Sequence, residues 1–183
     1  MDAPFIILDF DGVLTSVNDT PGSFLSHAPD EYGISEPCME RLLRLIKKTG
    51  AKVVVSSNWR RFDETGPGSV WCCNAQNYRN NLPEVRRRLG AAWTGTLPDM
   101  QRGDRKSKAL AEWFGANGLD PATARYVIFD DQCGWEGYYG YPEFAKRCVD
   151  TDRETGLTDA DCERAEALLL GRYNILARKD IQT

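Results

Sequence analysis

Three short runs of apolar residues stand out along the chain, and each gives way at once to polar side chains. Such continuous runs, without the alternation of a half-exposed strand, are typical of strands buried on both faces of a parallel sheet. They occupy residues 4–8, 51–55 and 125–129, and residues 145–149 form a weaker fourth candidate. The pattern therefore predicts a sheet whose central strands are covered on both sides.

Helical spacing of apolar residues fills much of the chain between these runs. It predicts helices over residues 36–48, 106–115 and 159–170, with Pro37 suited to the first turn of the first helix and Thr158 to the cap of the last. Strands that alternate with helices predict an α/β fold with a mostly parallel sheet flanked by helices.

Residues 59–105 show no clear period apart from a short helical stretch at 82–89. We interpret this span as an insertion that could form a small lid. A length of 183 residues fits one domain and is short for two, so we expect residues 1–183 to form a single domain without a large cap.

The composition is that of a globular protein. Hydrophobic residues make up 42% of the chain and charged residues 27%, which excludes disordered, collagen-like and coiled-coil classes. No apolar run approaches the roughly 20 residues of a membrane helix, and acidic residues interrupt the start of the chain where a signal peptide is apolar. We therefore expect a cytoplasmic protein without membrane association, whose six scattered cysteines are free thiols.

The net charge of −4 hides an asymmetry along the chain. Residues 58–108 hold ten Lys or Arg against five Asp or Glu, a balance of +5, so the remainder carries −9. A basic middle segment could attract a polyanion or a phosphorylated substrate, although a solvated charged face is the default interpretation.

Polar, mostly acidic side chains follow all three main strands. Because the carboxyl ends of parallel strands meet at one edge of an open sheet, we expect these side chains to converge on a ligand crevice. Clustered carboxylates repel one another unless a cation lies among them, and their oxygen atoms suit Mg²⁺. A single Asp after a strand is more often a helix cap, but three coincident strand ends indicate a metal and phosphate site. The residues concerned are Asp9, Asp11, Ser56, Ser57, Asp130 and Asp131.

Four motifs in a fixed order carry a resemblance to a known family. They are LDFDGVLT at 8–15, KVVVSSN at 52–58, a lysine at the start of the helix at 106–115, and YVIFDD at 126–131. In this order they resemble the haloacid dehalogenase-like (HAD) phosphohydrolases, although Val13 stands where many phosphatases of that family have Thr. The resemblance implies a Rossmannoid sheet, an aspartyl-phosphate mechanism and a Mg²⁺ cofactor.

The resemblance also implies roles for the acidic residues. Asp9 is expected to attack phosphorus as the nucleophile, and Asp11 to act first as general acid and then as general base. The metal is expected to be bound by the side chains of Asp9, Asp130 and Asp131 and by the backbone carbonyl of Asp11. Of Asp130 and Asp131, Asp130 is favoured as the direct ligand.

Hydroxyl and basic groups are expected, by the same resemblance, to bind the phosphoryl group. Ser56 is favoured for holding a phosphoryl oxygen, with Ser57 as the alternative. Lys106 resembles the cation that neutralises the transferring group, and Lys108 and Arg105 compete for this role. The candidate substrate-binding residues are Ser57, Asn58, Arg60 and Lys108.

The lengths of the segments between the motifs limit the size of any cap over the site, and with it the kind of substrate. They leave room for little more than a modest lid, and weakly capped members of the family often act on macromolecules such as nucleic-acid ends and phosphoproteins. The segments SSNWRR and TLPDM resemble a poorly characterised HAD subgroup, some members of which are associated with RNA-repair domains. Aromatic residues near the arginines of the span 59–105 could stack on nucleobases, or they could pack this span against the core. The aromatic residues from Trp135 to Tyr141 could line the crevice or pack on the surface.

Together these features predict a Mg²⁺-dependent phosphomonoesterase that acts through a phosphorylated Asp9 on nucleic-acid ends or nucleotides. The alternatives are a phosphatase of small phosphometabolites and a phosphate-binding regulatory module without turnover. No obligate protein partner is evident.

Overall fold

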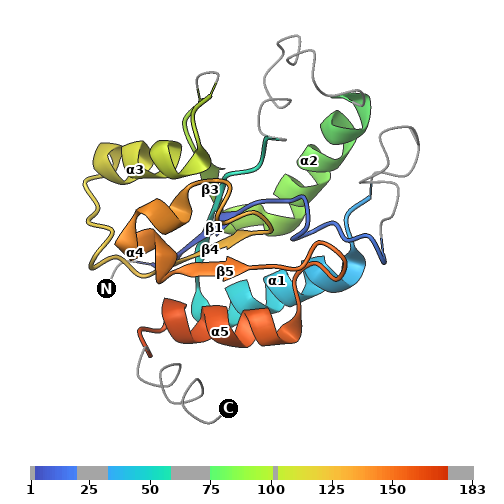
Figure 1. The fold of residues 1–183 in the computed structure, drawn as a ribbon. Coiled ribbons are helices and arrows are strands. Elements are labelled where there is room, and N and C mark those ends of the chain that lie inside the picture. The colour runs from blue at the N-terminus through green and yellow to red at the C-terminus, as the bar shows by residue number, and fades with distance from the viewer. Residues whose placement is uncertain (1–2, 20–32, 59–74, 101–102, 173–183) are drawn as a thin grey trace.

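The computed structural model describes residues 3–19, 33–58, 75–100 and 103–172 (Figure 1). Over these residues the chain forms a five-stranded sheet in which every neighbouring pair is parallel, in the order β3-β2-β1-β4-β5. The parallel Rossmannoid sheet predicted from the sequence is therefore confirmed. The strands are β1 (Phe5–Leu8), β2 (Lys52–Val55), β3 (Trp93–Thr96), β4 (Tyr126–Asp130) and β5 (Cys148–Asp150).

Helices cover both faces of the sheet. Those that share one apolar cluster with the sheet are α1, α2 and α5, while α3 and α4 pack on the opposite face (Figure 1). The α-helices are α1 (Glu36–Thr49), α2 (Ala75–Leu89), α3 (Lys106–Ala116), α4 (Pro142–Ala145) and α5 (Asp159–Leu169).

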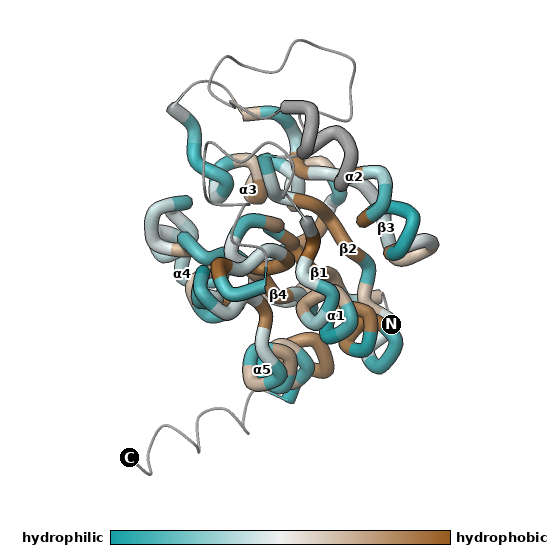
Figure 2. The backbone as a smooth tube through the Cα atoms, turned by 90° about the vertical axis from the view of Figure 1, so that its right-hand side faces the viewer, coloured by the Kyte–Doolittle hydropathy of each residue, from teal (hydrophilic) through white to brown (hydrophobic). Residues whose placement is uncertain are grey.

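The alternation of side chains along each strand explains the two clusters. In β1, Ile6 and Leu8 belong to the cluster under α1, α2 and α5, whereas Ile7 belongs to the cluster under α3 and α4. All three are fully buried, and Figure 2 shows the central strands as the hydrophobic interior of the molecule. A strand with apolar neighbours on both faces has no polar side to present, which is why its sequence is a continuous apolar run.

Local signals fix the ends of the helices. α1 begins where the Ser35 hydroxyl accepts a hydrogen bond from the Cys38 N–H, and it ends at Gly50, which adopts a φ of 68°. α5 begins with a capping box, in which Thr158 and Asp161 satisfy each other's backbone N–H groups. The predicted cap of α5 is thus confirmed.

Two elements differ from the sequence prediction. β3 is not predicted, because an edge strand whose residues alternate between half-buried and exposed lacks a continuous apolar run. The fourth predicted strand at 145–149 begins too early, since Pro142–Ala145 forms the single turn α4 and the strand starts at Cys148.

The span 59–105 is not an insertion throughout. α2 contributes Leu82, Val85 and Leu89 to the core, and β3 is part of the sheet. Residues 59–74 and 101–102 lie outside the described residues, so a lid built from them stays a prediction, as does the assignment of residues 1–183 to a single domain.

The helices and the cysteines bear on two further expectations. Of the helices in the described part of the chain, none has the length and apolar character needed to cross a bilayer. The cysteines described there are free thiols, as expected, and Cys72 and Cys73 lie outside the described residues. The free thiols are Cys38, Cys133, Cys148 and Cys162.

Candidate active site

The carboxyl edge of the sheet brings together residues from three neighbouring strands. The Asp9 N–H donates to the Phe129 carbonyl at 3.0 Å, and the Ser56 N–H donates to the Leu8 carbonyl at 2.8 Å. Asp9, Ser56 and Asp130 therefore leave adjacent strands at the same level. This is also where the chain passes to opposite sides of β1, the position at which open α/β sheets bind ligands.

Lys106 joins two of these strand ends. Its amine donates to Asp9 Oδ2 at 2.6 Å and to Asp130 Oδ2 at 2.9 Å, and it lies 3.9 Å from Glu136 Oε1. Lys106, Asp9 and Asp130 are each at least 96% buried, so this is an ion pair inside the protein. The position of Lys106 as the first residue of α3 aims its side chain back toward the strand ends.

Backbone N–H groups hold the two carboxylates in place. The second oxygen of Asp9 accepts from the Phe10 N–H at 2.8 Å, and the second oxygen of Asp130 accepts from the Gln132 N–H at 2.9 Å. Each carboxylate therefore has one oxygen turned to the backbone and one turned to Lys106. Such fixed donors orient a reacting group before any substrate binds.

Burial and charge shift the pKa values of the cluster. Burial and the neighbouring Asp9 raise the pKa of Asp130 to about 7, against the opposing effect of Lys106. Burial and then Asp9 also raise the pKa of Asp131. Burial alone would lower the pKa of Lys106, but Asp9, Asp130 and Glu136 together raise it instead. Among the described residues, the carboxylates of the cluster thus outnumber the cations that contact them, Lys106 and Arg153.

Three carboxylates fit a hard divalent cation. One oxygen each of Asp9, Asp130 and Asp131 lies within 4.8 Å of the others. Asp131 Oδ2 accepts from Arg153 Nε at 3.0 Å, but its Oδ1 is buried and has no hydrogen-bond partner. Because a buried carboxylate oxygen without a donor is costly, this atom is suited to a metal ion, and oxygen ligands of this kind favour Mg²⁺.

A tight turn after β1 brings Asp131 against the backbone. Gly12 adopts a φ of 67°, and a Cβ at this position would lie 2.5 Å from Asp131 Cβ. The Gly12 N–H donates to Thr15 Oγ1 at 3.2 Å, and its carbonyl accepts from Thr151 Oγ1 at 2.8 Å. Glycine is therefore required here both for its backbone conformation and for the close approach of the carboxylate.

The remaining predicted residues fall in different places. Asp11 is half-buried in the turn after β1, and Ser56 and Ser57 are buried at the end of β2. Lys108 is exposed, and its amine contacts both oxygens of Asp104 at 3.0 Å, outside the cluster that Lys106 joins. Asn58 is exposed beside the buried serines, and Arg60 lies outside the described residues.

Sequence reasoning missed two residues around the cluster, Glu136 and Arg153. Glu136 accepts from the Lys106 N–H at 3.2 Å, and Arg153 binds Asp131. Tyr138 belongs to the aromatic residues expected to line the crevice or to pack on the surface, and it is fully buried with no hydrogen-bond partner for its hydroxyl. Burial, followed by Asp130 and Asp9, raises the pKa of Tyr138. Glu136 and Arg153 lie in segments without periodicity, so only the spacing from the DD motif could have pointed to Glu136.

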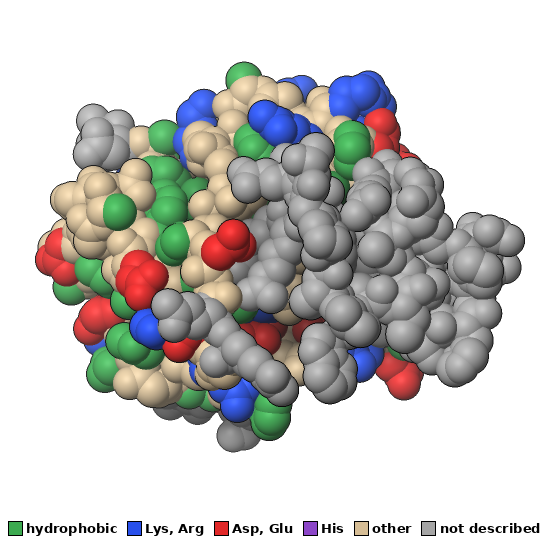
Figure 3. Space-filling model, turned by 90° about the horizontal axis from the view of Figure 1, so that it is seen from above, with side chains coloured by type: hydrophobic (Ala, Val, Ile, Leu, Met, Phe, Trp, Pro, Cys, Tyr) green, Lys and Arg blue, Asp and Glu red, His purple; other side chains and the backbone are tan. Residues whose placement is uncertain are grey.

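Several Lys and Arg side chains in the described part of the basic segment are paired with acids. Arg87 lies 2.6 Å from Glu84, and Arg88 lies 2.7 Å from Glu36. Figure 3 shows several Lys and Arg side chains along the upper margin of the face seen from above, with many acidic side chains elsewhere on that face. For these arginines on α2 the structure favours a solvated, ion-paired face over a surface reserved for a polyanion.

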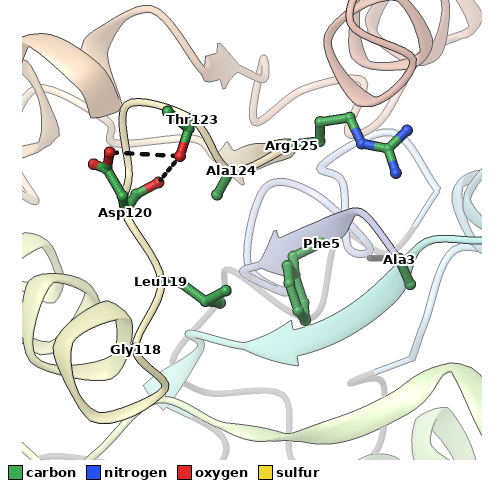
Figure 4. Close-up of a pocket in the computed structure, with 8 residues that line it drawn as sticks. All are labelled: Ala3, Phe5, Gly118, Leu119, Asp120, Thr123, Ala124 and Arg125. Atoms are coloured by element: carbon green, nitrogen blue, oxygen red, sulfur yellow. Dashed lines mark hydrogen bonds between the residues drawn. The ribbon is translucent and has the colours of Figure 1, made fainter. Parts of the chain in front are cut away.

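A shallow pocket of about 350 Å³ lies at the opposite edge of the sheet (Figure 4). Phe5 at the start of β1 and Arg125 just before β4 line it, so it is formed where these strands begin. The carboxylate of Asp120 is engaged in its own turn, where it accepts from the Ala122 N–H at 2.9 Å. Its lining offers no cluster of acids and bases comparable to that at the carboxyl edge.

A family match covers most of the chain. Residues 5–162 match the model of the family described as HAD domain in Swiss Army Knife RNA repair proteins. The matched region contains all five described strands and the acidic cluster with Lys106. No curated protein and no solved structure was found to match the chain.

Because Asp131 lies against Gly12, replacing Gly12 by alanine should lower the free energy of unfolding more than the same replacement at Gly50. Gly50 has nearly the same φ, 68°, but nothing lies within 4 Å of a Cβ built there. Gly50→Ala should therefore cost only the strained backbone, about 1 kcal/mol, whereas Gly12→Ala should cost about 1–3 kcal/mol more. Urea unfolding measures both, and equal losses would show that the approach of Asp131 does not constrain position 12.

Removal of the Lys106 charge should destabilise the metal-free protein. Lys106→Met leaves Asp9 and Asp130 buried without their cation, a change that costs about 3–5 kcal/mol in comparable buried pairs. Lys108→Met removes an exposed amine from the same helix and should leave the unfolding midpoint unchanged. The ion-pair account fails if the two variants unfold at the same urea concentration.

Proposed function

The chain belongs to the family of HAD domains in Swiss Army Knife RNA repair proteins, and from this premise we propose that it is a Mg²⁺-dependent phosphomonoesterase acting on phosphorylated nucleic-acid ends. The observation that carries the proposal is the buried arrangement of Asp9, Lys106 and Asp130 at the carboxyl edge of the sheet. It supplies a nucleophile, a fixed positive charge and a set of metal ligands within one site.

Asp9 is the nucleophile in the proposed reaction. An oxygen of its carboxylate attacks phosphorus, and the bond between phosphorus and the leaving oxygen breaks. Asp11 gives the leaving oxygen a proton. In the second step Asp11 takes a proton from water, the water oxygen attacks phosphorus, and inorganic phosphate leaves with the Asp9 carboxylate restored.

Lys106 and the serines stabilise the transferring group. The Lys106 amine donates to Asp9 Oδ2 at 2.6 Å, which supports the proposal that it neutralises charge on the phosphoryl oxygens as they approach. Ser56 follows β2 directly and is the proposed donor to a phosphoryl oxygen, with Ser57 as the alternative. Asn58, Arg60 and Lys108 are proposed to contact the rest of the substrate.

The metal would be held by Asp9, Asp130 and Asp131, with the backbone carbonyl of Asp11 as a further proposed ligand. When bound, Mg²⁺ would supply positive charge to the phosphoryl oxygens. The unpartnered Asp131 Oδ1 supports direct coordination by Asp131 as well as by Asp130.

Phosphate release tests the proposed reaction. Asp9→Asn should lower kcat at least about 10³-fold on a terminally phosphorylated RNA oligonucleotide, because an amide does not attack phosphorus. Asp99→Asn changes an exposed aspartate beyond β3 and is the matched control. Chelation of divalent cations should abolish release by the wild-type protein. Full activity of the Asp9→Asn variant would refute the mechanism, and release from sugar phosphates alone would point to small phosphometabolites.

The acid role of Asp11 predicts a dependence on the leaving group. The aryloxide released from an aryl phosphate is a weak base and can leave without a proton, whereas the alkoxide released from an alkyl phosphate needs a proton on the departing oxygen. Asp11→Asn should therefore slow phosphoenzyme formation on alkyl phosphates far more than on aryl phosphates, as measured by single-turnover kinetics. An equal loss on both substrates would exclude Asp11 as the general acid.

A further inference from the structure

Exposed aromatic side chains gather in the segment that follows β4. Trp135 is 65% exposed, Tyr139 53% and Tyr141 41%. Among the residues that the structure describes, these are the large aromatic side chains left most open to solvent. Because exposing a tryptophan to water is unfavourable, a largely exposed indole beside a reaction site indicates a surface that binds something.

Trp135 carries a cation on its ring. The Arg105 guanidinium carbon lies 4.0 Å from the ring centroid, within the range of a cation–π contact. In the described part of the chain no carboxylate lies within ion-pair distance of Arg105, unlike its neighbours Lys106 and Lys108. The charge of Arg105 is thus available to an anion.

This pair is connected to the active site on both sides. Arg105 directly precedes Lys106, and Trp135 directly precedes Glu136. The Glu136 carboxylate accepts from the Lys106 N–H at 3.2 Å, and the Glu136 carbonyl accepts from the Ser107 N–H at 3.2 Å. Arg105 is therefore next in sequence to Lys106, and Trp135 is next to the residue that accepts from the Lys106 N–H.

The segment that carries Trp135 is held in one conformation. The Glu136 N–H donates to the Gln132 carbonyl at 2.9 Å, and the Tyr138 N–H donates to the Cys133 carbonyl at 3.1 Å. Gly137 adopts a φ of 79°, and a Cβ there would lie 2.8 Å from Ser107 Oγ. A platform that is already ordered loses little conformational entropy when a ligand binds.

We propose that Trp135 and Arg105 form a platform that binds the nucleobase of the substrate's terminal nucleotide. The base stacks on the exposed part of the indole, and the Arg105 guanidinium faces the neighbouring phosphodiester. A nucleotide joins an aromatic ring to phosphate within one unit, which matches an aromatic surface beside a phosphate site. The base must be unpaired to stack in this way, so the substrate is single-stranded at its end. The proposal rests on the phosphomonoesterase function proposed above.

The test uses two single-stranded RNA oligonucleotides that carry a terminal phosphate, one complete and one lacking the base of the terminal nucleotide. The wild-type protein should prefer the complete oligonucleotide roughly tenfold or more in kcat/KM, in line with the usual strength of stacking on an aromatic side chain. Trp135→Ala should reduce this preference to about one. Trp135→Phe should restore part of it, which a merely structural role would not predict.

Tyr141→Ala is the matched control, because Tyr141 is an exposed aromatic residue of the same segment. The preference should survive in this variant. The proposal is overturned if the preference persists in Trp135→Ala, if Tyr141→Ala loses it equally, or if a phosphopeptide is hydrolysed in preference to both oligonucleotides.

A binding measurement separates this proposal from the proposed reaction. Fluorescence anisotropy of the same two labelled oligonucleotides gives the contribution of the terminal base to Kd without turnover. If the wild-type protein releases no phosphate but binds the complete oligonucleotide more tightly through Trp135, the platform stands and the reaction does not. If phosphate is released but the two oligonucleotides bind with the same Kd, the platform is refuted and the reaction stands.

Discussion

The Lys106 amine, buried between the Asp9 and Asp130 carboxylates, is the interaction on which the rest of the site depends. Two carboxylates that leave neighbouring strands at the same level would repel each other in a water-poor site without a cation between them. α3 supplies this cation from its first residue, and Glu136 binds the backbone at the start of the same helix. Strands and helix are thus joined at the point where chemistry is proposed to occur.

Among the residues that the structure describes, the same cluster carries more negative than positive charge. Asp131 adds a third carboxylate, and Arg153 contacts one of its oxygens while the other is buried without a partner. A protein that kept this arrangement only for stability could replace the acids by apolar residues, since buried ion pairs contribute little net free energy. A surplus of carboxylate oxygens instead favours a divalent cation and, with it, a phosphate ligand.

Much of the fold could be predicted because buried parallel strands have a distinctive sequence. The runs at β1, β2 and β4 are uninterrupted apolar segments followed by polar residues, and the structure brings Asp9, Ser56 and Asp130 together as expected. β3 escaped prediction because it lies at the edge of the sheet and half of its residues are exposed. α4 is a single turn, too short for helical periodicity to be visible.

The candidate site was predicted less completely than the fold. Motif order pointed to Asp9, Lys106 and Asp130, but Glu136 and Arg153 come from irregular segments whose path depends on tertiary contacts. The structure also shows which lysine contacts these carboxylates, since Lys106 at the start of α3 binds Asp9 and Asp130 while Lys108 pairs with Asp104. Spacing along a sequence does not tell which of two nearby lysines a carboxylate will meet.

The central claim is that Asp9 becomes phosphorylated during turnover. The wild-type protein is mixed with a phosphorylated oligonucleotide and the reaction is quenched during turnover. Borohydride then reduces any acyl phosphate, which labels the phosphorylated residue, and mass spectrometry locates that label. The account predicts that reduction converts Asp9 and no other aspartate to homoserine, in an amount that follows the steady-state phosphoenzyme. Steady turnover with an unmodified Asp9, or with the label on Asp11 or Asp130, would contradict it.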